Sequence, residues 1–329
     1  MRSPRAAQTG TCGPPPAAWP RGPITGYVAA PGYEKELVAE LRDAGAGEPV
    51  AVCGRLVLAR GDARPAAWAH NVWFGPERIE VRSISDAARK LKARGRRWAL
   101  LPHALFRRST LIAGKLQRAE AGPLHFPAPL PDRPHGSFML LDADTVLASA
   151  RCSRNTPNGE ISFVEDHVGP PSRAYLKLWE ALTLFGVRPG PGERCADLGS
   201  SPGGWTSVIA NLGAEVLSID KAPLDPGVAG MKNVTFARGS AFGVDLRAEG
   251  PFDWVFWDVI CYPGRLLRRV DEWLAQGVSE RFVCTVKFQG ETDMAAVRRF
   301  KKLPGSALVH LNHNQHELTW VKLPSLSGA

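Results

Sequence analysis

Four polar residues lie in or beside apolar segments of the second half of the chain: Lys177, Asp258, Lys287 and Glu317. Alone, each has an ordinary explanation, such as a turn-forming aspartate or a lysine whose amine reaches solvent. Together they supply two cations and two carboxylates, a set that could take a proton from a poor acid such as a ribose hydroxyl near neutral pH. Burial or a second cation lowers the pKa of a lysine, and carboxylates orient its amine.

A glycine-rich turn follows an apolar run that ends in Asp197. Gly199 permits a sharp turn, while Gly203 and Gly204 lack the side chains that would hold a ligand away from the main chain. The spacing fits neither a dinucleotide site nor a P-loop, so the predicted ligand is poor in phosphate. Asp220 ends the next strand-like run, where it could accept hydrogen bonds from ribose hydroxyls. An adenosine with a non-phosphate tail, as in S-adenosylmethionine, fits this pattern.

Apolar strands alternate with helices from residue 171 onward. Strands are expected at residues 194–198, 215–220, 234–238, 253–258, 281–288, 307–312 and 317–323, and helices at 172–185, 205–212, 266–276 and 293–300. This order predicts a doubly wound α/β sheet that closes with an antiparallel hairpin. Reactive side chains gather at the carboxyl ends of the strands in such sheets, so the four polar residues are expected to meet there.

The first half of the chain carries most of the positive charge. The formal net charge is +9, and residues 85–122 hold ten basic residues against two acids, a net of +8. Aromatic residues interleave with this window, which favours a polyanion such as RNA as the partner. The predicted RNA-binding residues are Arg89, Lys90, Lys92, Arg94, Arg96, Arg97, Arg107 and Arg108.

Proline- and glycine-rich segments divide the chain into predicted parts. These are a flexible tail (1–23), a small α/β module (24–75), a basic RNA-binding module (76–160) with a proline-rich linker (122–136), and a C-terminal domain (165–325). No apolar run approaches the ~18 residues of a membrane helix, and the tail lacks the apolar core of a signal peptide. Six cysteines contain no CxxC pair, so a reducing cytoplasm is expected.

The C-terminal motifs resemble the FtsJ-like family of ribose 2'-O-methyltransferases. Ser172-Arg173-x-x-x-Lys177, the turn at residues 197–205, Thr285-Val-Lys287 and Glu317 carry the likeness. The resemblance implies a Rossmann-like domain that binds S-adenosylmethionine, with Lys177, Asp258, Lys287 and Glu317 as the catalytic tetrad. Lys287 would be the base, and Lys177 would position the hydroxyl. The cofactor-binding residues would be Asp197, Gly199, Ser200, Pro202, Gly203, Gly204, Trp205, Asp220, Ser240 and Asp258.

The segments 28–37 and 153–158 are similar to RlmM-type methyltransferases, which act on a cytidine ribose of 23S rRNA and carry a THUMP RNA-binding domain. The resemblance therefore implies a THUMP-like fold before the catalytic domain, and 23S rRNA or its precursor as the partner, with no DNA and no membrane. One departure concerns Ser240, which stands where the family usually has an aspartate for the adenine amino group. A serine could accept that hydrogen bond without charge assistance.

Two alternatives are weighed against this interpretation. A non-catalytic RNA-binding factor for ribosome assembly could retain the fold, although all four tetrad positions hold the expected residue types. A metal site at His310, His313 and His316 is disfavoured, because a spacing of three suits a helix and this region is predicted as strand, loop and strand. No metal is therefore expected.

Overall fold

The computed structural model describes residues 19, 22–119 and 122–326, so the predicted tail lies almost wholly outside the described residues. The chain divides into two compact units. Unit 1 comprises the described residues of Met1–Gly122 and Leu130–Ile161, and unit 2 comprises Pro123–Pro129 and the described residues of Ser162–Ala329. Both predicted N-terminal modules therefore lie in unit 1, and part of the proline-rich linker lies in unit 2.

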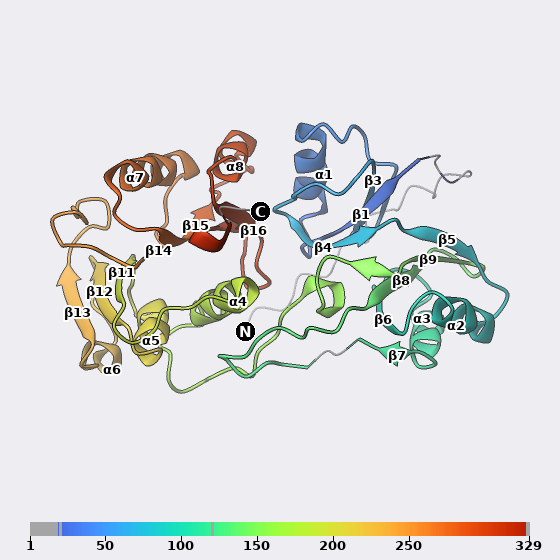
Figure 1. Cartoon of the computed structure of the whole chain (residues 1–329), viewed down its shortest axis with the longest axis horizontal. Helices are drawn as coiled ribbons and strands as arrows, with labels where there is room; N and C mark the ends of the chain where they lie inside the picture. Colours follow the sequence, from blue (N-terminus) through green and yellow to red (C-terminus); the bar gives the residue numbers. More distant parts are fainter. Residues whose placement is uncertain (1–18, 20–21, 120–121, 327–329) are drawn as a thin grey trace. The chain divides into compact units, whose positions relative to one another are not determined.

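Unit 1 contains two five-stranded sheets (Figure 1). The first, in the order β10-β4-β1-β3-β2, consists of β1 (Ile24–Ala29), β2 (Ala51–Cys53), β3 (Leu56–Arg60), β4 (Ala69–Phe74) and β10 (Arg151–Cys152). The second, in the order β5-β9-β8-β6-β7, consists of β5 (Glu77–Glu80), β6 (Arg97–Leu100), β7 (Gln117–Arg118), β8 (Gly136–Leu140) and β9 (Thr145–Ser149). Helix α1 (Glu34–Asp43) contacts β3, while α2 (Ile84–Lys92) and α3 (Phe106–Ala113) lie side by side near β6.

The β8–β9 hairpin joins the two halves of unit 1, because alternate residues of a strand face opposite sides of its sheet. Phe138 and Leu140 pack in one core cluster with Trp98. Met139, between them, packs in the other cluster with Trp73. Strand β10 also pairs with β4, so the two predicted modules share a sheet and a buried core.

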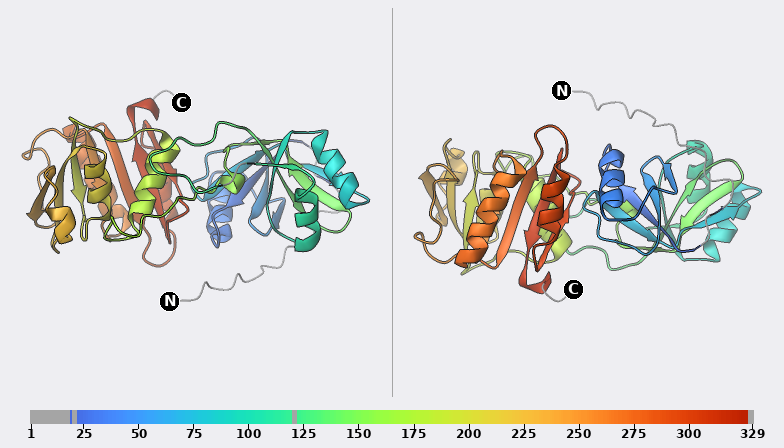
Figure 2. Two further views of the ribbon diagram at one scale, coloured as in Figure 1. Left: turned by 90° about the horizontal axis from the view of Figure 1, so that it is seen from below. Right: turned by 90° about the horizontal axis from the view of Figure 1, so that it is seen from above.

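Unit 2 is built on a seven-stranded sheet in the order β13-β12-β11-β14-β15-β17-β16. The strands are β11 (Arg194–Leu198), β12 (Glu215–Asp220), β13 (Val234–Arg238), β14 (Trp254–Trp257), β15 (Arg281–Lys287), β16 (Ser306–Val309) and β17 (Glu317–Lys322). The helices are α4 (Tyr175–Phe185), α5 (Gly204–Asn211), α6 (Pro226–Ala229), α7 (Pro263–Gln276) and α8 (Met294–Lys301). Figure 2 shows α4 and α5 on one face of this sheet and α7 and α8 on the other.

The strand directions agree with the predicted doubly wound sheet. Strands β11 to β15 pair in parallel, and β17 runs antiparallel to both β15 and β16. Strand β17 is inserted between β15 and β16, so the last strand of the chain lies inside the sheet. This insertion places Glu317 directly opposite Lys287 in the β15–β17 register.

Within unit 2, the proline-rich segment 123–129 packs against helix α4. Phe126 stacks on Trp179 of α4 with ring centroids 4.8 Å apart, and it meets Phe163 edge to face at 6.5 Å. Aromatic pairs of this kind add to the free energy gained by burial. The segment therefore braces the helix that carries Lys177. Among the described helices, none is both long and apolar enough to cross a membrane.

Candidate active site

Four separate elements bring the predicted tetrad together at the carboxyl edge of the sheet in unit 2. Lys177 lies in the first turn of α4, and Asp258 follows the last residue of β14. Lys287 ends β15 and Glu317 begins β17, so antiparallel pairing sets these two side by side. The backbone N–H of Asp258 donates to the carbonyl of Leu198, 3.1 Å away, which ties the end of β14 to the glycine-rich turn.

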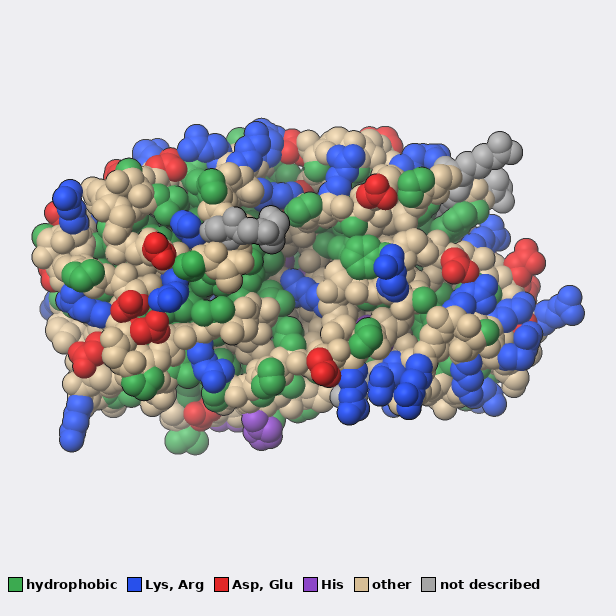
Figure 3. All heavy atoms as spheres, viewed as in Figure 1, with side chains coloured by type: hydrophobic (Ala, Val, Ile, Leu, Met, Phe, Trp, Pro, Cys, Tyr) green, Lys and Arg blue, Asp and Glu red, His purple; other side chains and the backbone are tan. Residues whose placement is uncertain are grey.

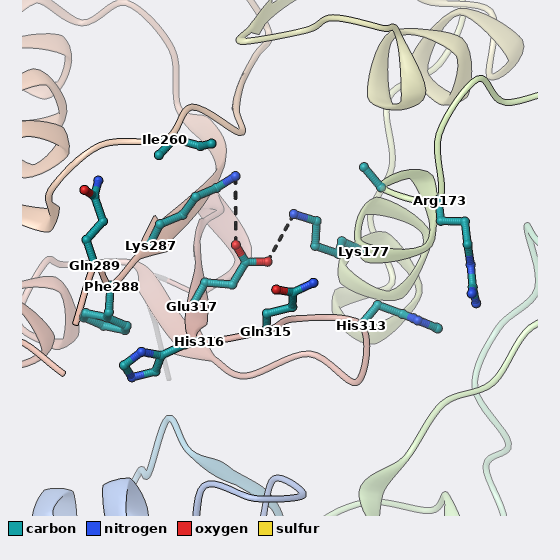
Figure 4. Close-up of a pocket in the computed structure, with 11 residues that line it drawn as sticks. Arg173, Lys177, Ile260, Lys287, Phe288, Gln289, His313, Gln315, His316 and Glu317 are labelled. Carbon is teal, nitrogen blue, oxygen red and sulfur yellow. Dashed lines mark hydrogen bonds and ion pairs between the residues drawn. The ribbon is translucent and has the colours of Figure 1, made fainter. Parts of the chain in front are cut away.

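The four side chains form a closed ring of ion pairs. Lys177 Nζ lies 3.0 Å from Asp258 Oδ2 and 3.1 Å from Glu317 Oε1. Lys287 Nζ lies 2.7 Å from Asp258 Oδ1 and 4.0 Å from Glu317 Oε2. Each carboxylate therefore uses one oxygen for each lysine, and Figure 4 shows both amines turned toward Glu317. The ring carries no net charge, which makes its burial tolerable.

The ring holds Lys177 as a cation. Burial acts to lower the pKa of Lys177, but the charges of Asp258 and Glu317 outweigh it, and the pKa is raised above its ordinary value. Burial likewise acts to raise the pKa of Asp258, and the two lysines reverse this effect so that the pKa is lowered. The side chain of Lys177 is 11% exposed and that of Lys287 is 19% exposed, so Lys287 is the more accessible amine.

A cavity of about 510 Å³ opens beside three members of the ring. Its polar lining includes two glutamines with exposed side chains, and its apolar lining includes Ile260, whose side chain is 75% exposed. The lining residues are Arg173, Ala174, Lys177, Ile260, Lys287, Phe288, Gln289, His313, Gln315, His316 and Glu317. A group that enters this cavity meets the amine of Lys287 (Figure 4).

The glycine-rich turn has the close packing that its sequence predicts. Gly199 has φ +79°, and a Cβ on it would lie 2.5 Å from Cγ2 of Val259. Gly203 has φ +114° and is the N-cap residue of α5, and a Cβ on Gly204 would lie 2.5 Å from the hydroxyl of Ser172. Larger residues at these positions would close the space between the turn and the ends of β14 and α4.

Asp197 is buried beneath this turn at 1% exposure. Its Oδ2 accepts a hydrogen bond of 2.6 Å from Thr206, and its Oδ1 has no hydrogen-bond partner among the described residues. Burial raises the pKa of Asp197 to about 7, against the hydrogen bond from Thr206, and Asp258 and Asp220 act in the same sense as burial. A cationic ligand near the turn would favour the ionised form of this carboxyl.

The other predicted cofactor residues surround the same turn. Asp220 ends β12, where Oδ2 accepts from the N–H of Ser201 (3.1 Å) and Oδ1 from that of Ala222 (2.9 Å). Ser240 follows β13, and its hydroxyl accepts from the N–H of Phe242 at 3.3 Å. The ring of Phe242 also lies under the guanidinium of Arg265.

Three more predicted residues lie in the turn itself and at the start of α5. Ser200 is buried, and its hydroxyl has no hydrogen-bond partner among the described residues. Pro202 is exposed. Trp205 is buried, donates from Nε1 to the carbonyl of Ala174 at 2.9 Å, and lies under the amine of Lys177. Trp205 thus connects the turn to the helix of the tetrad.

The predicted RNA-binding residues lie in unit 1, on α2, in the turn between α2 and β6, on β6 and on α3. Arg89, Lys92, Arg94, Arg96 and Arg107 are exposed, and Lys90, Arg97 and Arg108 are half-buried. Lysine and arginine side chains gather over this part of the surface (Figure 3). A second cavity of about 430 Å³ is lined by Ser85, Ala88, Arg89, Lys92 and Lys115.

Two acids near this basic surface neutralise part of it. Asp86 pairs with Arg89 and, at 3.2 Å, with Lys90, and Glu77 pairs with Arg94 at 2.9 Å. Trp98, one of the aromatic residues within the basic window 85–122, is 2% exposed and belongs to the core. It cannot stack on a base.

The histidines near Glu317 make ordinary contacts. His310 Nε2 lies 3.1 Å from the carbonyl of Gln315, and His316 Nε2 lies 2.8 Å from the hydroxyl of Thr292. Burial lowers the pKa of His313. Among the described residues no group of three or more His, Cys, Asp or Glu side chains could hold a metal ion.

Sequence reasoning found three members of the ring that line the cavity, but it missed other lining residues and the residues that support the site. Ile260, Gln289 and Gln315 lie in loops, whose residues have no periodicity to indicate which way they face. Glu180 is buried in α4, and here a signal existed: it is an acid in an apolar helical run, three residues after Lys177. Positions three apart lie on the same helix face.

A comparison with protein families identifies the region around this site. Residues 170–301 match the family model described as FtsJ-like methyltransferase. The resemblance predicted from the sequence is confirmed for this FtsJ-like segment, which is less than half of the chain. The segment contains Lys177, Asp258 and Lys287, and Glu317 lies beyond its end.

Curated relatives named "Ribosomal RNA large subunit methyltransferase M" match part of the chain. The protein of Halorhodospira halophila is 36% identical over 132 residues, which cover 39% of this chain and 38% of the relative. That of Stenotrophomonas maltophilia is 33% identical over 168 residues, 47% of each protein. The chain therefore spans less than half the length of these relatives.

Among solved structures, a 1,6-didemethyltoxoflavin-N1-methyltransferase of Burkholderia thailandensis is 16% identical, with a TM-score of 0.32, and the match covers 45% of this chain and 76% of that one. At this TM-score the likeness carries no argument about function.

The raised pKa of Asp197 predicts how its replacement alters stability with pH. The folded-state pKa of about 7 lies above the ordinary value of 3.8, so the native protein loses stability as the pH rises between these values. Asp197→Asn removes this loss. The free energy of unfolding of the variant minus that of the wild type should increase by about 2 kcal/mol from pH 5 to pH 7, as measured by chemical denaturation at both pH values. A difference that stays constant with pH would contradict the burial argument.

Proposed function

We propose that the chain is a cytoplasmic enzyme that transfers a methyl group from S-adenosylmethionine to a ribose 2'-hydroxyl of RNA. The substrate we propose is a cytidine of 23S rRNA or its precursor. The observation that carries the proposal is the closed ring of Lys177, Asp258, Lys287 and Glu317 beside a cavity and next to a glycine-rich turn. The FtsJ-like segment and the names of the curated relatives support the reaction class.

The residues around the turn suit the cofactor. Gly199 and Gly204 leave space that a Cβ would fill, and the buried Oδ1 of Asp197 lacks a hydrogen-bond partner among the described residues. Asp197 would face the positive charge of the ligand, and Asp220 at the end of β12 would bind the ribose. Ser240 would accept a hydrogen bond from the adenine amino group. When bound, S-adenosylmethionine supplies a methyl group already activated by a sulfonium.

The protein's own contribution is alignment and proton transfer. Lys177, kept positive by two carboxylates, would donate a hydrogen bond that fixes the target hydroxyl. Lys287, the more exposed amine, would act in its neutral form and accept the hydroxyl proton at Nζ as the oxygen attacks the methyl group. Asp258 touches both lysines, so it holds their spacing constant while the proton moves. General base catalysis by a positioned side chain contributes about 10²-fold to 10⁴-fold.

Arginine substitutions separate the proposed roles of the two lysines. Lys287→Arg keeps the positive charge but cannot act as a base, because the guanidinium stays protonated. We expect it to lower the rate of methyl transfer about 10²-fold or more. Lys177→Arg preserves a donor and a charge, so its loss should be smaller. Transfer of labelled methyl groups to ribosomal RNA fragments measures both rates, and equal activity of Lys287→Arg and the wild type would exclude Lys287 as the base.

The nucleotide specificity is tested in cells. Mass spectrometry of nucleosides from 23S rRNA, with and without the gene, should show 2'-O-methylcytidine missing from the deleted strain. A plasmid carrying the wild type should restore it, and one carrying Lys287→Arg should not. An unchanged nucleoside profile in the deleted strain would exclude 23S rRNA as the substrate. RNA binding without any methyl transfer would favour the alternative of an assembly factor.

We also propose that the basic surface of unit 1, in a THUMP-like fold, binds the RNA backbone. Arg89 and Lys92 line its cavity and are exposed. Replacing both with alanine should reduce the slope of log affinity against log salt by roughly 1 to 2, because each lost phosphate contact removes about one unit. The control is Arg42→Ala with Arg60→Ala, two exposed basic residues outside the 85–122 window. Equal slopes for the two double variants, measured by filter binding, would contradict the assignment.

A further inference from the structure

Glu180 connects the helix of the catalytic ring to the loop that precedes β17. It lies on α4 three residues after Lys177, on the same helix face. Its carboxylate is 1% exposed. Oε1 accepts a hydrogen bond of 2.8 Å from the backbone N–H of Asn312, and Oε2 accepts one of 3.4 Å from that of His313.

The loop that Glu180 contacts, residues 310–316, leads directly into Glu317. Within it, the Asn314 side chain donates to the carbonyl of Glu317 at 3.1 Å and to the hydroxyl of Thr319 at 3.1 Å. The carbonyl of His316 accepts from the N–H of Phe288 at 3.1 Å. These hydrogen bonds connect the loop firmly to the start of β17. A displacement of residues 312 and 313 would therefore also displace Glu317.

Helix α4 thus holds this loop and the start of β17 at two points. One is the ion pair of Lys177 with Glu317 at 3.1 Å, and the other is the pair of hydrogen bonds that Glu180 accepts. Packing alone does not explain an acid here, because Leu178 and Ala181, which are close to it in α4, are buried and a buried carboxylate is costly. The hydrogen bonds that Glu180 accepts offset that cost. Their donors lie in the loop that positions Glu317 in the ring.

We propose that Glu180 is a positioning residue for the reaction. It fixes the loop 310–316 so that Glu317 presents one oxygen to each lysine. This inference rests on the proposed function for its kinetic consequence, while its structural consequence can be measured without activity.

The experiment uses the full chain and two substitutions. Glu180→Gln keeps the shape and one acceptor oxygen, and Glu180→Ala removes both acceptors. The matched control is Glu40→Ala in unit 1. Glu40 is 2% exposed and also accepts two consecutive backbone N–H groups, from Ala67 at 2.8 Å and Trp68 at 3.1 Å. It makes the same kind of contact far from the ring in sequence and in a different unit.

Two readouts are compared. Hydrogen exchange of residues 310–317 should rise roughly tenfold in Glu180→Ala and remain at the wild-type level in Glu40→Ala. The kcat of methyl transfer should fall about 10-fold to 100-fold in Glu180→Ala, with unchanged KM for RNA and an unchanged dissociation constant for S-adenosylmethionine. Glu180→Gln should give a smaller fall, and it keeps the test valid where the alanine variant does not fold.

The outcomes separate cleanly. Unchanged exchange of residues 310–317 in Glu180→Gln and Glu180→Ala overturns the positioning role. Increased exchange with wild-type kcat also overturns it, because Glu317 would then need no such support. If the wild type methylates no RNA, the proposed function fails, and the exchange result still decides whether Glu180 holds the loop.

Discussion

The ring of two lysines and two carboxylates constrains the whole of unit 2. Four charges with side chains 10% to 19% exposed are tolerable only where each has opposite partners, and here each lysine reaches both acids. The partners come from α4, the end of β14, β15 and β17. Three strand termini and one helix must therefore meet at one point of unit 2. The antiparallel insertion of β17 next to β15 places Glu317 opposite Lys287.

The glycine-rich turn depends on the same junction. A Cβ on Gly199 would lie 2.5 Å from Val259, the neighbour of Asp258, so the turn approaches the ring closely. Trp205 reaches the carbonyl of Ala174 and stands under the amine of Lys177. The glycine-rich turn and the ring of ion pairs are therefore packed against the same residues. In the proposed reaction, these shared contacts set the distance between the methyl donor and the target hydroxyl. The reaction rate depends on the alignment of these two groups.

The sequence predicted the parts of this arrangement that periodicity and strand order control. Asp258 and Lys287 follow apolar strands, so their meeting at one edge of the sheet could be expected from the parallel order alone. The rest of the cavity lining could not be predicted from strand order, because Gln289 and Gln315 lie in loops whose conformation depends on contacts distant in sequence. Trp98 shows the reverse failure: it lies among basic residues in the sequence, but it is buried in a core cluster of unit 1.

The charge balance also distinguishes the two lysines. Lys177 is hydrogen-bonded to both acids, whose charges raise its pKa against the effect of burial, and this suits the proposed role of Lys177 as a donor to the target oxygen. Lys287 has one short contact, to Asp258, and lies 4.0 Å from Glu317. Lys287 therefore has one close ion pair, where Lys177 has two. In the proposed reaction, this asymmetry of the ring and the greater exposure of Lys287 favour Lys287 as the group that exchanges a proton with the substrate.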